Sequence, residues 1–327
     1  MKPSDFAKHL TDYLSSYLPG QRGISSNTIK SYVDTFRLLL TYCRDVKNIA
    51  PERMSLQKMD ADLITGFLDW LESDRGNSIS TRNQRLAAIH AFCRHLQTES
   101  PEHMAVLQKN LCIPYKKYAK PHLGYLSLSD MTEMLAKPDL TIASGRRDLA
   151  LLSLLYDSGA RVSELVDLHV RDLRLDEFPT VTLFGKGQKF RYVPIMRKTA
   201  ELLKKYIFEN HLDKPERFDD PLFVNRQRKK LTRAGVTYIL KKYTDDESVT
   251  PHVLRHTKAM HLLQVGVNIV YIRDILGHAS VETTSIYARA DVEMKRKAIE
   301  SVSDKAMPEV PDWTSDNVLM EWLKQLS

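Results

Sequence analysis

Apolar side chains recur every three or four residues through the first ~115 residues, which is the spacing of one face of an α-helix. An amphipathic stretch runs over residues 5–18, and a second helix is predicted after the cap-forming residues Ser25, Ser26 and Asn27. Two more stripes follow, one over residues 64–71 and one after Ser80. The apolar positions of the last three stripes are Ile29, Val33, Phe36, Leu39, Leu40 and Cys43; Ile64, Phe67, Leu68 and Leu71; and Leu86, Ile89, Cys93 and Leu96. We therefore predict a helical domain over residues 1–112.

Basic side chains lie between the apolar positions of the fourth predicted helix. They are Arg82, Arg85, His90, Arg94 and His95. This helix is thus predicted to have one apolar face and one basic face. Such a face is often only solvated surface, but in a basic chain we favour contact with nucleic-acid phosphate.

Residues 113–125 break the helical pattern. They hold two prolines, three lysines and a glycine, which predict an extended connector. The alternation of tyrosine and lysine would suit a strap lying along DNA, and a plain linker is the alternative.

The pattern of the second half begins with helices and then changes period. A helix start is predicted at Ser129–Asp130, and a buried helix over Leu149–Tyr156 ends at Gly159. Two runs of period two follow, Thr180–Phe184 and Lys189–Ile195. These runs predict a hairpin because a short, glycine-rich segment joins them.

Helical periodicity then returns and continues to about Ile299. We therefore predict a mainly α fold with a small antiparallel β-sheet in a C-terminal domain, residues 126–306. The tail, residues 307–327, carries two prolines and then a small amphipathic pattern. That pattern consists of Val318, Leu319, Trp322 and Leu323. This helix could dock on a neighbouring protomer or fold back on its own domain.

Composition and charge narrow the class of partner. The net charge is +7 and the isoelectric point about 9.1, which favours an anionic partner such as nucleic acid. The three cysteines are widely spaced and form no Cys-x-x-Cys pair, which argues against a disulfide framework or a zinc site. Neither a signal peptide nor a membrane-spanning stretch is visible, so a cytoplasmic protein is expected.

Candidate chemistry begins at Thr250-Pro251, where a cap and a first-turn proline predict a helix N-terminus. His252 and Arg255 then share one face of the first turn. A guanidinium beside a helix N-terminus suits phosphate, and an imidazole there can move a proton. His-x-x-Arg alone is weak evidence, since many proteins contain one.

Four further residues complete the candidate set. His278 follows the helix stop at Gly277, and Tyr287 lies two turns into the next predicted helix, where a packing tyrosine is the ordinary interpretation. Arg161, between two helices, should be partly buried and in need of an anion, either the internal carboxylate of Glu164 or a ligand. Lys186 occupies the hairpin tip, where a solvated lysine is the alternative.

In this order the motifs resemble those of the tyrosine recombinase (phage integrase) family. The matching strings are Gly-Ala-Arg161-Val-Ser-Glu-Leu, Gly-Lys186-Gly-x-Lys, Pro-His252-x-Leu-Arg255-His, and Leu-Gly-His278 with Tyr287 nine residues on. The N-terminal helices resemble the family's SAM-like core-binding domain through Ser25-x-x-Thr28-x-x-x-Tyr32 and Ser80-Thr-x-Asn-x-x-Leu86. The resemblance covers essentially the whole chain and is strongest to the XerC/XerD type and to mobile-element integrases.

The resemblance implies a site-specific recombinase that cuts and rejoins DNA through a 3′-phosphotyrosine on Tyr287. It implies that Arg161 and Arg255 bind the phosphate oxygens, His252 acts as base, Lys186 as acid, and His278 as a hydrogen-bond donor to the phosphate. Lys189 and Lys198 are weaker candidates for the acid. No metal and no other cofactor are implied.

The resemblance also implies partners and architecture. Two domains would form a C-shaped clamp around double-stranded DNA at an inverted-repeat core site, with a homo-tetramer or a related recombinase in the synaptic complex and no membrane. One departure is that Ala288 and Arg289 follow Tyr287, where the family pattern ends in a histidine at the second position. That position is not catalytic.

Three alternatives remain at this stage. The same site could serve a type IB-like topoisomerase, or the chain could be a catalytically inactive DNA-binding regulator. A zinc protein using His252, His256 and His261 is the third, although these spacings make a poor ligand set on one helix face.

Overall fold

The computed structural model describes residues 4–118, 124–185, 189–277, 321–322 and 324–325. The chain divides into two compact units at Pro121–His122, within the predicted connector. The family-based domain boundaries themselves stay predictions. Among the described residues no helix is both long and apolar enough to cross a membrane.

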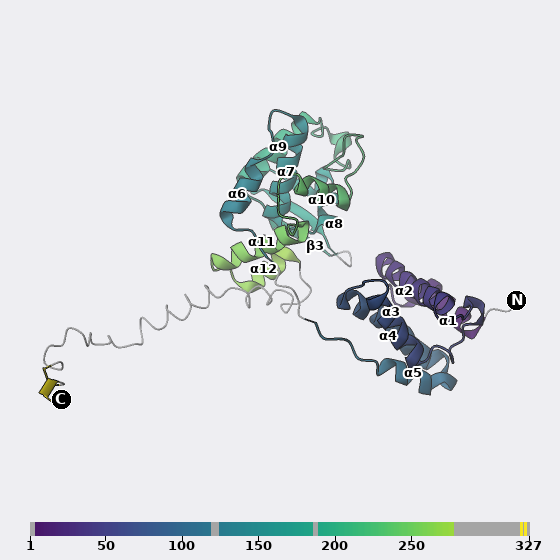
Figure 1. Cartoon of the computed structure of the whole chain (residues 1–327). Helices are drawn as coiled ribbons and strands as arrows, with labels where there is room; N and C mark the ends of the chain where they lie inside the picture. The colour runs from purple at the N-terminus through teal and green to yellow at the C-terminus, as the bar shows by residue number, and fades with distance from the viewer. Residues whose placement is uncertain (1–3, 119–123, 186–188, 278–320, 323, 326–327) are drawn as a thin grey trace. The chain divides into compact units, whose positions relative to one another are not determined.

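The first unit is helical, as the apolar stripes predict (Figure 1). Its helices are α1 (Asp5–Asp12), α2 (Ser26–Asp45), α3 (Ala61–Ser73), α4 (Ile79–Glu99) and α5 (Met104–Leu111). Their apolar faces meet in one core, in which Cys43 and Cys93 are buried as predicted. The first predicted helix extends further than its stripe, because α1 continues as a wider π-helical segment, Tyr13–Gln21, that accommodates Pro19.

The prediction of an exposed basic face on α4 is wrong for three of its five residues. Arg82 and His90 are buried, and Arg85 donates to Asp34 at 2.7 Å and to the Ser31 carbonyl at 3.1 Å. The physical reason is that α4 packs against several neighbouring helices, so the face outside its apolar stripe also points into the unit. A separate set of contacts belongs to the connector.

The start of the connector lies against α4 through hydrogen bonds, one of them from Arg82, which the sequence pattern predicted to contact phosphate. Arg82 donates to the Pro114 carbonyl at 3.1 Å, and the Asn83 side chain donates to the Lys116 carbonyl at 2.8 Å. The Tyr118 hydroxyl donates to Ser80 at 3.2 Å. These contacts give Arg82 and Asn83 a structural role within the first unit.

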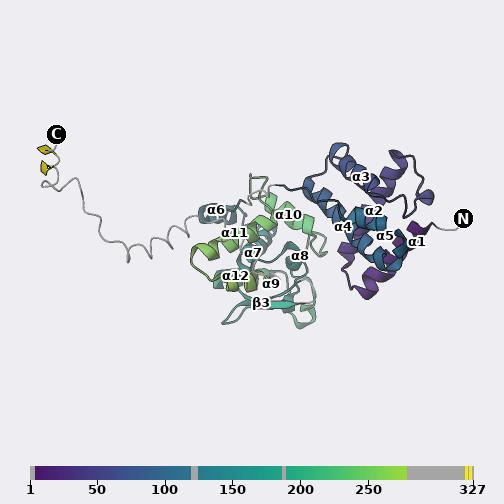
Figure 2. The ribbon, with the colours of Figure 1, turned by 90° about the horizontal axis from the view of Figure 1, so that it is seen from below.

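The second unit packs helices against one face of a small antiparallel sheet, and the change of period predicts this sheet (Figures 1 and 2). Its helices are α6 (Leu128–Ala136), α7 (Ala143–Ser158), α8 (Val162–Val166), α9 (Arg197–Glu209), α10 (Arg233–Lys241), α11 (Pro251–Gln264) and α12 (Ile269–Leu276). Helix α11 packs against both α7 and α12. The core of the unit lies between the helices and the sheet.

The sheet has the order β1–β2–β3, with β1 at Leu173–Arg174, β2 at Thr180–Phe184 and β3 at Phe190–Pro194. The predicted hairpin is confirmed, since Phe184 pairs with Phe190 and Thr180 with Pro194. The short strand β1 was not predicted, because two residues are too few to show a period. Lys186, at the hairpin tip, lies outside the described residues.

The two glycines correctly predicted where helices end, whereas two of the serines were wrongly predicted as the positions where helices begin. Helices α7 and α12 end at Gly159 and Gly277, both left-handed with φ of 57° and 63°. The predicted starts at Ser80 and Ser129 are each two residues late. The observed caps are Ser78, which accepts from the Thr81 N–H, and Ser127, which forms a capping box with Asp130.

Candidate active site

Arg161 follows the left-handed turn at Gly159, at the start of α8. Its backbone N–H donates to Glu164 Oε2 at 2.9 Å, and its guanidinium donates to Glu164 Oε1 at 2.7 Å. The side chain is 40% exposed, so it is partly buried, as predicted, and still open to a ligand. Glu164 is therefore the internal carboxylate that the sequence suggested for Arg161.

Arg255 lies inside α11, whose N-terminus has the predicted cap: Thr250 accepts from the Val253 N–H, with Pro251 at the first position. Its guanidinium donates to the carbonyls of Gly159 at 2.7 Å and Leu276 at 2.6 Å. It also lies 4.0 Å from Glu164 Oε2. Arg255 is 2% exposed, so its charge stands where water screens it little.

His252 is exposed on the first turn of α11, while Arg255 three residues later is buried. The protein around the imidazole removes part of its water and so lowers the pKa of His252, and the charges of Arg255 and Arg161 lower that pKa further. The imidazole is therefore kept neutral near pH 7, which is the form that can accept a proton.

Arg191, on β3, is a member of this cluster that sequence reasoning missed. It donates to Glu164 Oε1 at 3.1 Å and Oε2 at 2.8 Å, and its Nε donates to the Ile275 carbonyl at 2.8 Å. The signal was present in the strand pattern, because alternation puts Arg191 on the same inward face as buried Val193. Phe190 and Tyr192, on the other face, are 60% and 62% exposed.

Three arginines thus surround one carboxylate. Burial of Glu164 tends to raise its pKa, but the hydrogen bonds from Arg191 and Arg161 outweigh that effect and the pKa is lowered. Glu164 therefore stays ionised, and the four groups together carry an excess of positive charge. Such a cluster can stabilise an added negative charge on a phosphate.

The same three arginines also bind the last three carbonyls of the α12 region. Arg191 binds the carbonyl of Ile275, Arg255 that of Leu276, and Arg161 that of Gly277 at 3.1 Å. These carbonyls are the negative end of the helix, where cations are favourable. The cluster therefore fixes the point from which the chain continues toward His278 and Tyr287.

The structure brings together Arg161, His252 and Arg255 of the six predicted site residues. Lys186, His278 and Tyr287 lie outside the described residues. His261, weighed above as a metal ligand, has both ring nitrogens engaged, with the Tyr156 hydroxyl at 2.8 Å and the Leu126 carbonyl at 2.9 Å. Within the described ranges no group of three His, Cys, Asp or Glu residues could hold a metal ion.

Comparison with known protein families gives two matches. Residues 125–294 match the phage integrase family, and residues 10–100 match the phage integrase N-terminal SAM-like domain. The first range contains the motifs around Arg161 and His252, and the second contains those that begin at Ser25 and Ser80.

Individual relatives match along most of the chain. A candidate integrase/recombinase of Sinorhizobium fredii, y4rC, is 38% identical over 313 residues, covering 92% of this chain and 93% of its own length. The tyrosine recombinase XerD of Listeria monocytogenes (strain F2365) is 32% identical over 285 residues, covering 85% of this chain and 92% of its own length. Among solved structures, the XerH site-specific recombinase bound to its palindromic difH substrate has a similar fold, with a TM-score of 0.68, 24% identity, and coverage of 86% of this chain and 81% of that one.

Proposed function

This chain belongs to the phage integrase family of tyrosine recombinases, and from that membership we propose how its own residues carry out the reaction. It is a site-specific recombinase, an enzyme that breaks and rejoins DNA. The proposal concerns the chemical step, the residues that perform it and the form of the DNA complex.

The Tyr287 oxygen attacks the phosphorus of a DNA phosphodiester. The bond from phosphorus to the 5′-oxygen breaks, and the products are a 3′-phosphotyrosine and a free 5′-hydroxyl. Attack of a 5′-hydroxyl on the phosphotyrosine reverses the step and rejoins the strand. Because the covalent bond conserves the energy of the broken linkage, no nucleotide cofactor is consumed.

Each site residue has one role in this step. His252 accepts the proton of the Tyr287 hydroxyl, and Lys186 donates a proton to the leaving 5′-oxygen. Arg161 and Arg255 bind the non-bridging oxygens, and His278 donates a hydrogen bond to the same phosphate. The lowered pKa of His252 supports its part as base, since a neutral ring is needed there.

The observation that carries the proposal is the convergence of Arg161 and Arg255 on buried Glu164. They come from different helices, yet one carboxylate and the end of α12 hold both. Arg161 uses part of its five N–H donors on these partners and remains 40% exposed, so an incoming phosphate can engage the rest.

The test is covalent capture on a nicked DNA site selected from a randomised pool by binding. Wild type should leave a protein–DNA adduct on a denaturing gel, and Tyr287→Phe should abolish the adduct while DNA binding is kept. Tyr271→Phe is the matched control, because Tyr271 is an exposed tyrosine of α12. An adduct that persists in Tyr287→Phe would overturn the assignment.

The DNA complex is proposed to be a clamp formed by the two units around a double-stranded, inverted-repeat core site, with four protomers in the synaptic complex. Two solved structures of similar fold support an inverted-repeat DNA site that binds several protomers. XerH is bound to a palindromic difH substrate, and lambda integrase is bound as a dimer to a core site. The proposed substrate is chromosomal or plasmid DNA. We therefore propose that the enzyme works in the cytoplasm, where such DNA is located. Relaxation of a plasmid without strand exchange would instead favour the topoisomerase alternative.

A further inference from the structure

A polar cavity lies in the second unit, away from the candidate active site. Its volume is about 350 Å³, and its walls come from the start of α7, the end of α9 and the chain between α9 and α10. Arg147, in its wall, precedes Gly159 by 12 residues along α7, which is about 18 Å of helix. The cavity and the arginine cluster at Glu164 therefore lie near opposite ends of one helix.

The cavity is lined by four arginines, Arg147, Arg217, Arg226 and Arg228, against a single acidic residue, Asp220. Arg217 donates to Asp220 at 2.7 Å, and Arg147 donates to Asp148 and to the Val224 carbonyl. The side chains of Arg226 and Arg228 form no hydrogen bond or ion pair with another described residue. The wall therefore holds more positive charge than its own partners neutralise.

The hydroxyl of Tyr206 lines the same cavity and lacks an acceptor. Tyr206 is 3% exposed, and no group among the described residues takes part in a hydrogen bond with its hydroxyl that meets normal geometry. Burial raises the pKa of Tyr206 to about 12, although the Val224 backbone and Arg147 lower it in part. The hydroxyl is therefore protonated at neutral pH, a buried donor that needs an acceptor.

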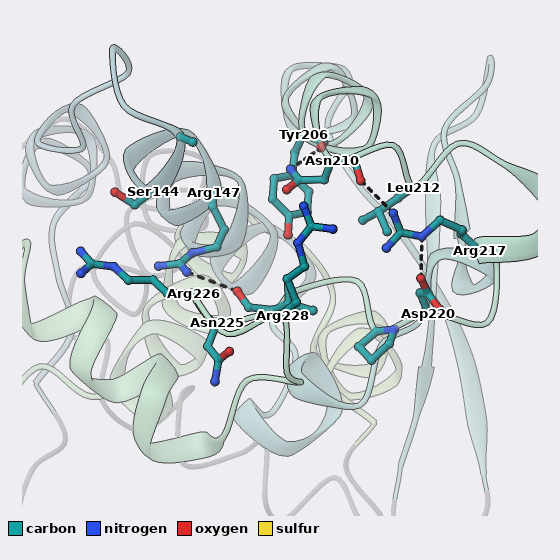
Figure 3. A pocket seen from close by; sticks show the side chains of 13 residues that line it. Ser144, Arg147, Tyr206, Asn210, Leu212, Arg217, Asp220, Asn225, Arg226 and Arg228 are labelled. Carbon is teal, nitrogen blue, oxygen red and sulfur yellow. Dashed lines mark hydrogen bonds and ion pairs between the residues drawn. The ribbon is translucent and has the colours of Figure 1, made fainter.

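Arg228 is held in the wall of the same cavity by a tight turn. Its φ is 56°, a left-handed conformation that is uncommon for arginine. The Asn225 side chain accepts from the N–H groups of Gln227 and Lys229, which fixes the turn. Figure 3 shows Arg228 and Tyr206 among the residues that line the cavity, while Arg226 points to the side.

We propose that this cavity is a phosphate-binding site, in which Arg228 and Tyr206 donate hydrogen bonds to the phosphate oxygens and Arg147 adds positive charge. An arginine fork matches two phosphate oxygens at once, and a neutral phenol donates to a third. The phosphate belongs either to a free phosphorylated ligand or to a DNA backbone that reaches the cavity. Neither source depends on the assignment of Tyr287.

The first measurement is a calorimetric titration of the full-length protein with inorganic phosphate at low ionic strength. Wild type should bind saturably, and Arg228→Gln should weaken binding at least tenfold. Arg174→Gln is the matched control, because it removes the same charge from an exposed position on β1. An equal loss of affinity in Arg228→Gln and Arg174→Gln would point to general charge attraction, and no loss in Arg228→Gln would exclude it from the site; either result overturns the proposal.

Tyr206→Phe provides a second variant that should not unfold the protein. It removes a hydroxyl that has no internal acceptor, so the thermal midpoint should stay the same or rise while phosphate binding weakens about fivefold. A lowered midpoint with unchanged phosphate affinity would mean that the hydroxyl serves the fold alone, which also overturns the proposal.

The source of the phosphate is separated by the salt dependence of DNA binding. If DNA supplies it, Arg228→Gln should reduce the slope of log K against log salt by about 0.9, and DNA should compete with phosphate. If a free ligand supplies it, the slope should not change and phosphate should bind equally well to the DNA complex. Either result supports the site. The proposal is contradicted if Arg228→Gln changes neither the affinity for phosphate nor the salt dependence of DNA binding.

Discussion

At the scale of the residue, Glu164 organises the candidate active site without acting in the chemical step. Its side chain is 3% exposed and lies within 4.0 Å of Arg161, Arg191 and Arg255. A carboxylate buried to this degree is tolerated only when it is paired and hydrogen-bonded. The same pairing places the arginines before DNA arrives, so less reorganisation is needed when the phosphate binds.

Removing Arg191 should weaken both the fold and the reaction. Arg191→Ala leaves Glu164 with one fewer partner and frees the Ile275 carbonyl, so we expect a loss of about 2–4 kcal/mol in the free energy of unfolding. The rate of covalent adduct formation should fall more than DNA affinity, because the origin of the segment that carries Tyr287 is less fixed. Calorimetry and single-turnover cleavage measure the two effects.

Gly277 provides a direct test of this contact. A Cβ at Gly277 would come within 2.9 Å of the Arg191 guanidinium and 3.1 Å of its Cδ, on a backbone with φ of 63°. Gly277→Ala should therefore lower the thermal midpoint strongly in wild type, through the clash and about 1–2 kcal/mol of backbone strain. In the Arg191→Ala background only the strain remains. Equal shifts in both backgrounds would contradict the contact.

The pH dependence of cleavage should reveal the environment of His252. The ordinary pKa of histidine is 6.5, and that of His252 is lowered, so its neutral form persists below pH 6.5. Cleavage should therefore decline only at more acidic pH. The rate measured at sub-saturating DNA reports the free enzyme. His252→Gln should be slower and should lose this acid limb. An acid limb centred at or above pH 6.5, or one kept in His252→Gln, contradicts the role.

At the scale of the element, strand β3 of the hairpin supports the arginine cluster of the site. Strand β3 carries Arg191 inward to Glu164. Lys186 precedes this strand in the sequence and lies outside the described residues. The position of β3 against α12 also brings Arg191 to the helix end. Strand β3 thus supports the arginine cluster, and the proposed acid Lys186 belongs to the same hairpin in the sequence.

Changing the lysine of this hairpin should affect only the leaving-group step. Lys186→Ala should slow cleavage of a normal 5′-oxygen about 10²–10⁴-fold, the usual value of a general acid. A substrate with a 5′-bridging sulfur should be cleaved nearly as fast as by wild type, since a thiolate leaves without a proton. Lys189→Ala is the control from the same hairpin. Equal slowing on both substrates would move the acid to another residue.

At the scale of the whole molecule, each unit has its own hydrophobic core, and the connector between them is anchored at both ends. Its start is bonded to α4, and Leu126, just beyond it, donates to Thr257 and accepts from His261. Each unit can therefore keep its internal geometry independently. The tail residues 321–322 and 324–325 are helical, in agreement with the amphipathic pattern as far as they are described.

Deleting the residues after Pro311 should test whether the tail joins protomers. Exchange between protomers predicts that the truncated protein still binds a single half-site but assembles poorly into synaptic complexes, as measured by native gel and light scattering. Trp322→Ala, at a residue that is 55% exposed, should act in the same direction more weakly. Unchanged assembly after truncation would favour a tail that folds back on its own domain.

Local chemistry determined much of this fold from the sequence by itself. Period-3.6 stripes predicted four of the helical segments of the first unit but not α5, the period-two runs predicted the hairpin, and glycine predicted the ends of α7 and α12. These features depend on neighbours within a few residues, which is why a single sequence contains them. The order of the motifs similarly sufficed for the family.

Tertiary structure alone decided which charged residues face inward. The sequence pattern indicated that Arg82 and Arg85 belong to a DNA-binding face, yet other helices and the connector surround them. The sequence pattern gave Arg191 only a place in a strand, yet this residue completes the arginine cluster at Glu164, 27 positions away in the chain. A charge is exposed or paired according to what distant segments bring beside it, and periodicity within one element carries no record of those segments.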